Sequence, residues 1–293
     1  MLQDLNVDTY PDASYYYALC LKYNAKYAEA KAAFNKFQKT YKGLNASALK
    51  KKAKIQADGC DLALNMIAHP DTVKVEHLGA NVNAPYTEFG PVPFDNDLLL
   101  YSSLKSDTII VLDDHKRNQS FAQFYAVPII NDSTYGDSYK YTGMPINDNN
   151  QHNGNGAFSV DRTRFYFTRC KLDENNMKMH CDIYMTEQKK GGYGWSNPVK
   201  LPAEINSDST QTHPAVGNSK DGEVLYFSSN RAQGTGGMDI WYSIKKGDTW
   251  SMALNVGKKI NTVGDDVTPY YDSKNYTSYP PMPGHPFELK YKV

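Results

Sequence analysis

The sequence predicts an α+β multidomain protein, in which an N-terminal α-helical domain precedes an all-β propeller with blades of about four antiparallel strands. Three observations predict this class. Residues 12–67 have helical periodicity, the chain beyond residue 78 changes to short strands separated by turns, and this second part repeats itself every 55–64 residues. We therefore expect a helical domain at 1–73, a propeller at 74–275 and a Pro/Tyr-rich tail or later region at 276–293.

Composition excludes two broad classes of protein. The 293 residues contain 32 Lys+Arg and 32 Asp+Glu. This balance, without a basic block, argues against a nucleic-acid binder. No apolar run is long enough to cross a membrane as a helix. The 23 Tyr, against 11 Phe, favour strands and loops.

The N-terminal region carries apolar stripes at helical spacing. One stripe consists of Tyr27, Ala30, Phe34, Phe37 and Tyr41, and a second consists of Leu49, Ala53, Ala57, Cys60, Leu64 and Ile67. With Ala18 at the small position of a preceding helix, Tyr27, Ala30 and Phe34 resemble the Tyr, Ala and Phe positions of a tetratricopeptide repeat. We expect a tetratricopeptide-like helical hairpin or cap.

The repeat in the second part is anchored by Val/Ile-Asn pairs that begin at residues 82, 146, 205 and 260. A turn, a short apolar strand and an Asp before an aromatic strand follow, and two copies close with Trp-Ser. About four short strands per copy indicate propeller blades. We interpret the recurring residues as structural, since repetition argues for turn-capping roles. For Asn230 and Arg231, a place on the upper face of the ring is an equal alternative to a role in fixing a turn. They are Asp161, Asp182, Trp195, Asp221, Gly222, Ser228, Asn230, Arg231, Gly236, Gly237, Asp239 and Trp250.

The motif formed by Ser228–Arg231 and Gly236–Trp241 resembles WD-like blades of the TolB type. Joined to a tetratricopeptide segment, such blades resemble periplasmic OmpA-family proteins of Bacteroidetes, including the peptidoglycan-associated component of the type IX secretion and gliding machinery. The resemblance covers most of residues 12–275. It implies an envelope protein whose OmpA-like, peptidoglycan-binding domain is absent from this chain.

The repeat predicts an incomplete ring. A fourth blade begins near Asn255 and Thr268, but no second strand follows before the tail. Three blades and part of a fourth are too few for the usual ring of four to eight. We therefore expect the propeller to be incomplete in this chain.

The four cysteines favour disulfides over metal or redox chemistry. No CxxC spacing exists, Cys170 and Cys181 lie on neighbouring arms of an expected hairpin, and Cys20 and Cys60 lie in helical segments. Two disulfides in an oxidising compartment are the preferred interpretation, and four reduced, buried cysteines are the alternative.

Other candidate chemistry is sparse. Asp265 and Asp266 could hold calcium but lack the regular spacing of a calcium loop. The seven His show neither HxxxH nor HExxH spacing. We expect no catalytic residue, no metal and no cofactor.

These observations lead to a functional hypothesis with two rivals. We expect a non-enzymatic scaffold in an outer-membrane secretion or motility assembly. Its partners would be envelope proteins, with peptidoglycan bound only through the absent domain. The expected location is the periplasm, at the outer membrane, with a signal peptide already removed. The rivals are a cell-surface glycan-binding propeller and a propeller hydrolase or lyase.

Overall fold

The computed structural model describes residues 10–70, 75–95, 97–105, 121–131, 133–173 and 177–271. Internal contacts divide the chain into two compact units, Met1–Glu76 and His77–Val293. The expected tail at 276–293 lies outside the described residues. No helix within the described ranges has the length and apolar character needed to cross a bilayer.

The first unit consists of helices α1 (Ala13–Tyr23), α2 (Tyr27–Thr40) and α3 (Ala46–Ala68). Both predicted stripes supply its core, which includes Ala18, Ala30, Phe34 and Cys60. The second stripe ends earlier than predicted, because Leu64 and Ile67 are 39% and 65% exposed. Assignment to the tetratricopeptide family stays a prediction.

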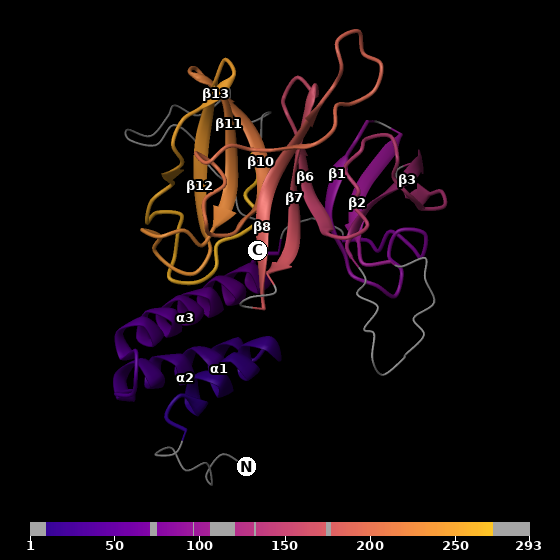
Figure 1. Ribbon diagram of the computed structural model, residues 1–293. Coiled ribbons are helices and arrows are strands. Elements are labelled where there is room, and N and C mark those ends of the chain that lie inside the picture. The colour runs from indigo at the N-terminus through magenta and orange to yellow at the C-terminus, as the bar shows by residue number, and fades with distance from the viewer. Residues whose placement is uncertain are drawn as a thin grey trace. The chain divides into compact units, whose positions relative to one another are not determined.

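The second unit contains three antiparallel sheets, seen in Figure 1 as a succession from magenta to yellow. The first comprises β1 (Glu88–Pro93), β2 (Leu98–Ser103), β3 (Gln123–Asn131), β4 (Thr134–Tyr135) and β5 (Tyr139–Lys140). The second comprises β6 (His152–Phe158), β7 (Arg164–Asp173), β8 (Lys178–Glu187) and β9 (Val199–Lys200). The third comprises β10 (Gln211–Ser219), β11 (Gly222–Ser229), β12 (Asp239–Lys246), β13 (Thr249–Trp250) and β14 (Leu254–Asn255).

The sheets stand side by side like propeller blades. The first strand of the middle sheet, β6, contacts β1 on one side and β10 on the other, so the three first strands are neighbours (Figure 1). Propeller-like sheets are thus present as predicted. Within the described part of the chain, the sheets do not close into a ring.

Strand β7 shows why its sequence is apolar at consecutive positions. Phe165 and Phe167 pack in the core shared with the first sheet, whereas Tyr166 packs in the core shared with the third. Side chains alternate between the two faces of a strand, and both faces of this strand are covered. Because both faces of β7 are covered, three consecutive aromatic residues of this strand are buried.

The repeated Val/Ile-Asn pairs fasten each sheet to the loop that follows it. Asn206 accepts a hydrogen bond from the Ile183 N–H (2.8 Å) and donates to the carbonyls of Ile183 (2.9 Å) and Leu201 (2.8 Å). Asn147 makes the same bonds to Phe124 of β3, and Asn261 makes them to Ile240 of β12. We call these three residues the asparagine clamps. Each clamp satisfies a backbone N–H of the strand, and it shares the carbonyl of the same residue with a backbone N–H of the following segment.

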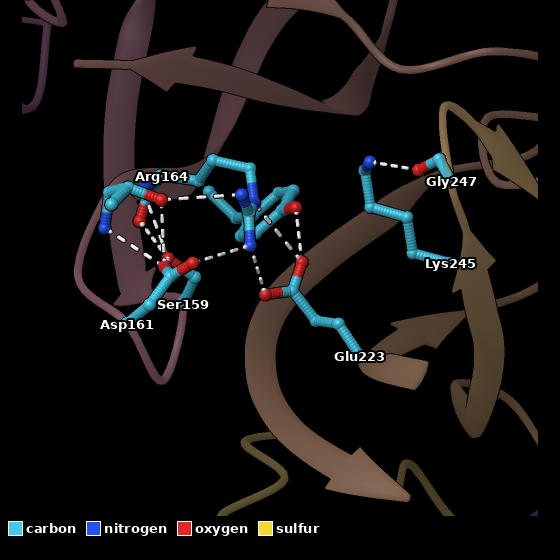
Figure 2. A network of polar contacts seen from close by, with 8 residues as sticks. Ser159, Asp161, Arg164, Glu223, Lys245 and Gly247 are labelled. Carbon is cyan, nitrogen blue, oxygen red and sulfur yellow. Dashed lines mark hydrogen bonds and ion pairs between the residues drawn. The ribbon is translucent and has the colours of Figure 1, made fainter. Parts of the chain in front are cut away.

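A polar network joins the middle and third sheets at the start of β7. Figure 2 shows Arg164 between Asp161, in the turn before β7, and Glu223 on β11. The Tyr166 hydroxyl donates to Glu223 Oε1 at 2.6 Å. This end of β7 is opposite the end that carries Cys170.

Candidate functional site

A groove lies where the first strands of the three sheets meet. Its volume is about 220 Å³. That is below the roughly 300–1,000 Å³ of pockets for drug-sized ligands, so it suits one small ring or chain end. Residues of β1, β6, β7, β10 and the segments after β2 and before β3 line it. They are Phe89, Leu104, Ala122, His152, Asn153, Gly154, Asn155, Thr168, Cys170 and Thr212.

The strand register explains why these residues meet. His152 on β6 lies opposite Cys170 on β7, which lies opposite Cys181 on β8. Gly154 permits the close approach of β1, since a Cβ there would lie 2.8 Å from Phe89 Cε2. The start of β6 and the end of β7 thus form one wall of the groove.

Hydrogen bonds fix the polar groups of this wall. The Asn153 amide donates to the carbonyls of Asp148 (3.0 Å) and Gln151 (2.9 Å), and its oxygen accepts from Arg169 Nε (2.8 Å). The hydroxyls of Thr168 and Thr212 lie 3.3 Å apart. Such preorganised groups lose little freedom when they bind a ligand.

His152 presents a neutral ring to the groove. Its Nδ1 accepts a hydrogen bond from the Ala122 N–H at 3.1 Å, and the ring meets Phe121 edge-on at 5.2 Å. Burial lowers its pKa, so the imidazole is uncharged at neutral pH. None of the ten described lining residues then carries a formal charge. The groove therefore offers hydroxyl, amide and imidazole groups beside apolar surface, which suits a neutral, polyhydroxylated ligand.

One predicted disulfide is confirmed and the other is wrong. Cys170 and Cys181 are bonded across the β7–β8 hairpin, with Cα atoms 4.0 Å apart. Cys20 and Cys60 are free. Cys60 is fully buried in the helical core, whereas Cys20 is exposed, so the two lie in different environments on α1 and α3.

Several predicted motif residues hold turns or are buried within strands. Asp161 accepts hydrogen bonds from Ser159 Oγ (2.6 Å) and Thr163 N (3.0 Å) in the β6–β7 turn. Asp239 accepts from the Thr235 N–H at 2.5 Å. Asp221 lies in the β10–β11 turn, and Ser228 is buried on β11. Gly222 has φ +136°, and a Cβ there would lie 2.2 Å from the Lys245 oxygen.

The remaining motif residues contact neighbouring segments of their own unit. Arg231 donates to the Ile205 carbonyl and lies over the rings of Phe227 and Trp241. Asn230 accepts a hydrogen bond from the Thr210 N–H, and Asp182 forms an ion pair with Lys200. Gly236 and Gly237 lie against the 262–264 loop. Trp195 and Trp250 pack on the cores of the middle and third sheets. None of them lines the groove.

The candidate calcium residues also have structural partners. Asp266 accepts from the Thr262 N–H at 2.6 Å, and Asp265 from the Met238 N–H at 2.9 Å. The described residues contain no cluster of three or more His, Cys, Asp or Glu placed to hold a metal ion.

The groove was not predicted from the sequence. His152, Asn155 and Thr212 match no repeated motif, and Thr168 lies in the repeated apolar strand without a predicted functional role. The four residues come from three strands. A usable signal is the dipeptide X-Pro in the first strand of a sheet, which occurs at Gly90-Pro91 on β1 and at His213-Pro214 on β10. Proline within a strand marks an edge or a bulge.

Comparisons with known proteins find fold likenesses only. No known protein family and no curated protein matches the chain. Among solved structures, a thermostable family-43 glycoside hydrolase is 12% identical, with a TM-score of 0.41 over 62% of this chain and 60% of that one. An endo-arabinase from Bacteroides thetaiotaomicron is 12% identical, with a TM-score of 0.37 over 56% and 60%. A putative TolB from Agrobacterium tumefaciens is 19% identical, with a TM-score of 0.31 over 60% and 49%.

The functional expectation needs correction. Neither the non-enzymatic secretion or motility scaffold nor the expectation that the chain is not an enzyme is upheld, because several of these solved structures are glycoside hydrolases. The likeness itself extends to the fold alone. The TolB-type likeness of the blades is found, but none of these solved structures supports the OmpA-family or type IX assignment. The chain spans 53–60% of the length of the first solved structures it matches.

Proposed function

We propose that the propeller-like unit binds carbohydrate in the groove between β1, β6, β7 and β10. The observation that carries the proposal is the chemistry of the lining: neutral amide, hydroxyl and imidazole groups beside the apolar surface of Phe89 and Leu104. A sugar ring has hydroxyls that donate and accept, and C–H faces that pack on apolar groups. A site without formal charge does not favour phosphate or other ionic ligands.

The disulfide supports a location outside the cytoplasm. Structural disulfides persist in oxidising compartments and are rare in the cytosol. The Cys170–Cys181 bond lies at the groove wall. We therefore place carbohydrate binding in the periplasm or at the cell surface.

Binding to a glycan array that includes peptidoglycan fragments tests the proposal. The expected result is saturable binding of at least one glycan. Leu104→Trp, which fills the groove, should weaken that binding at least tenfold. Leu254→Trp is the matched control, because Leu254 lies on β14, is 53% exposed and does not line the groove. An array without a ligand, or equal binding by both variants, would overturn the proposal.

The same glycans should be assayed for new reducing ends. Glycoside hydrolysis in most families needs two carboxyl groups, roughly 5–10 Å apart, around the scissile bond. The described lining contains no carboxylate. Turnover would therefore show that residues outside this lining take part in the reaction.

A further inference from the structure

Each first strand of the three sheets carries a bulge at the same place. The pairing register shifts between Phe89 and Val92 on β1, between Gly154 and Gly156 on β6, and between Thr212 and Ala215 on β10. A bulge inserts a residue into one strand and redirects its side chain. Three bulges at one level of neighbouring strands form a repeated feature of the unit.

The residue inside each bulge has a left-handed backbone. Gly90 has φ +59°, Asn155 has φ +49° and His213 has φ +52°. Thr268, at the corresponding place in the following repeat, has φ +57°. This conformation is unfavourable for residues other than glycine, and less so for Asn. The backbone is thus constant, whereas the side chain changes from none to amide, imidazole and hydroxyl.

Asn155 shows where such a side chain lies. It lines the groove, next to the bulge of β1. A Cβ at Gly90 would lie 2.9 Å from Asn155 Oδ1 and 3.2 Å from its Cα. The missing side chain at position 90 therefore makes room for the amide at position 155.

His213, inside the bulge of β10, does not itself line the groove. It follows Thr212, a lining residue, and its backbone N–H donates to the hydroxyl of Thr168, another lining residue, at 3.1 Å. Its Nδ1 is buried and has no hydrogen-bond partner among the described residues. Burial lowers the pKa of His213 to about 4, so the ring is neutral at pH 7. His213 is therefore a bulge residue whose side chain can be changed without changing the lining.

We propose that the bulge residue Asn155 determines which sugar the groove accepts. The inference rests on the carbohydrate-binding function proposed above. The bulge supplies a fixed backbone, and the Asn155 amide supplies part of the hydrogen-bonding pattern that a sugar must match. A ligand that fails to pair a buried polar group loses affinity steeply, which makes such positions selective.

The test exchanges side chains between equivalent bulges. Asn155→Gly takes the residue found at position 90. His213→Asn takes the residue found at position 155 and is a matched control, because His213 lies in an equivalent bulge but does not line the groove. Gly and Asn both tolerate the left-handed region, so the fold should be retained. Gln233→Asn is a second control, because Gln233 is exposed, has φ +70° and does not line the groove.

The glycan array and titration of its best ligand give the readout. The expected result is a changed ranking of glycans or an affinity loss of at least tenfold for Asn155→Gly. His213→Asn and Gln233→Asn should match the wild type, and the melting temperatures of all three variants should stay close to it. A wild type that binds no glycan overturns the proposed function itself. A wild type that binds, with folded Asn155→Gly keeping its ranking and affinity, overturns this inference alone.

Discussion

Arg164 on β7 and Glu223 on β11 form an ion pair between neighbouring sheets, with Nη2 and Oε2 2.9 Å apart (Figure 2). The Glu223 side chain is only 8% exposed. Burial and the Glu223 charge raise the pKa of Tyr166, so its hydroxyl keeps its proton and donates to the carboxylate. Two donors from the middle sheet thus share one acceptor of the third.

Glu223→Gln should therefore lower the free energy of unfolding by about 2 kcal/mol. Removing one member of a buried pair costs roughly 3–5 kcal/mol, and the 22% exposure of Arg164 reduces that figure. Urea unfolding measures the change. Glu187→Gln, at an exposed position opposite Arg164 on β8, is the control and should change it by less than about 0.5 kcal/mol. Equal effects would contradict the structural role of the pair.

Asp161 should make stability depend on pH in the acid range. Burial opposes its ionisation, but hydrogen bonds from Ser159 and Thr163 and the charge of Arg164 outweigh it and lower the pKa of Asp161 to about 2. A carboxyl whose folded pKa is below its unfolded value of about 3.9 stabilises the fold above pH 4. That stabilisation is lost as the pH falls from 4 towards 2.

Asp161→Asn removes this titration. Unfolding of wild type and variant at pH 6, 4, 3 and 2 is the measurement. The wild type should be the more stable at pH 6, and its advantage should shrink below pH 4. The effect should be modest, since the Asp161 side chain is 54% exposed. A constant difference at every pH would show that another group sets the acid response.

The asparagine clamps should be costly to remove. Asn206→Ala deletes three hydrogen bonds and leaves the Ile183 N–H buried without a partner. We expect a loss of about 3 kcal/mol, from about 1–3 kcal/mol for each buried unsatisfied group. Asn149→Ala, at an exposed residue whose side chain accepts a hydrogen bond from Lys140 Nζ, should cost less than about 0.5 kcal/mol by the same chemical denaturation. A small effect at Asn206 would mean that water replaces the clamp.

Thiol titration checks the cysteine assignment. Denatured, unreduced protein should show two free thiols, and reduction should raise the count to four. In the folded protein, exposed Cys20 should react with a thiol reagent well before Cys60, because burial raises the pKa of Cys60 and blocks access. Four free thiols without reductant would contradict the hairpin disulfide.

The sequence predicted features that a local pattern or a repeat encodes. The helical stripes gave the core positions of α2 and most of α3, and repeat spacing gave the succession of sheets. Exposure of Leu64 and Ile67 was not visible, because periodicity marks an apolar face without showing what covers it. The expected Cys20–Cys60 bond failed because shared helicity says nothing about distance.

The groove was hidden for another reason. Gly90, Asn155 and His213 occupy equivalent bulges but share no side-chain chemistry, so comparing repeats by residue type passes over them. Asn147, Asn206 and Asn261 are identical and were recognised as anchors. Their hydrogen bonds to the preceding sheet required coordinates.

Because of the asparagine clamps, the boundaries of the sequence repeat differ from the boundaries of the folded blade. Asn147 follows β5 yet secures β3, and Asn206 follows β9 yet secures β8. A chain cut after the last strand of a sheet keeps every strand of that blade and loses its fastening. Excised blades should therefore extend through the asparagine of the next repeat. If the repeats arose by duplication, the asparagine that secures one blade would belong to the sequence repeat of the next blade.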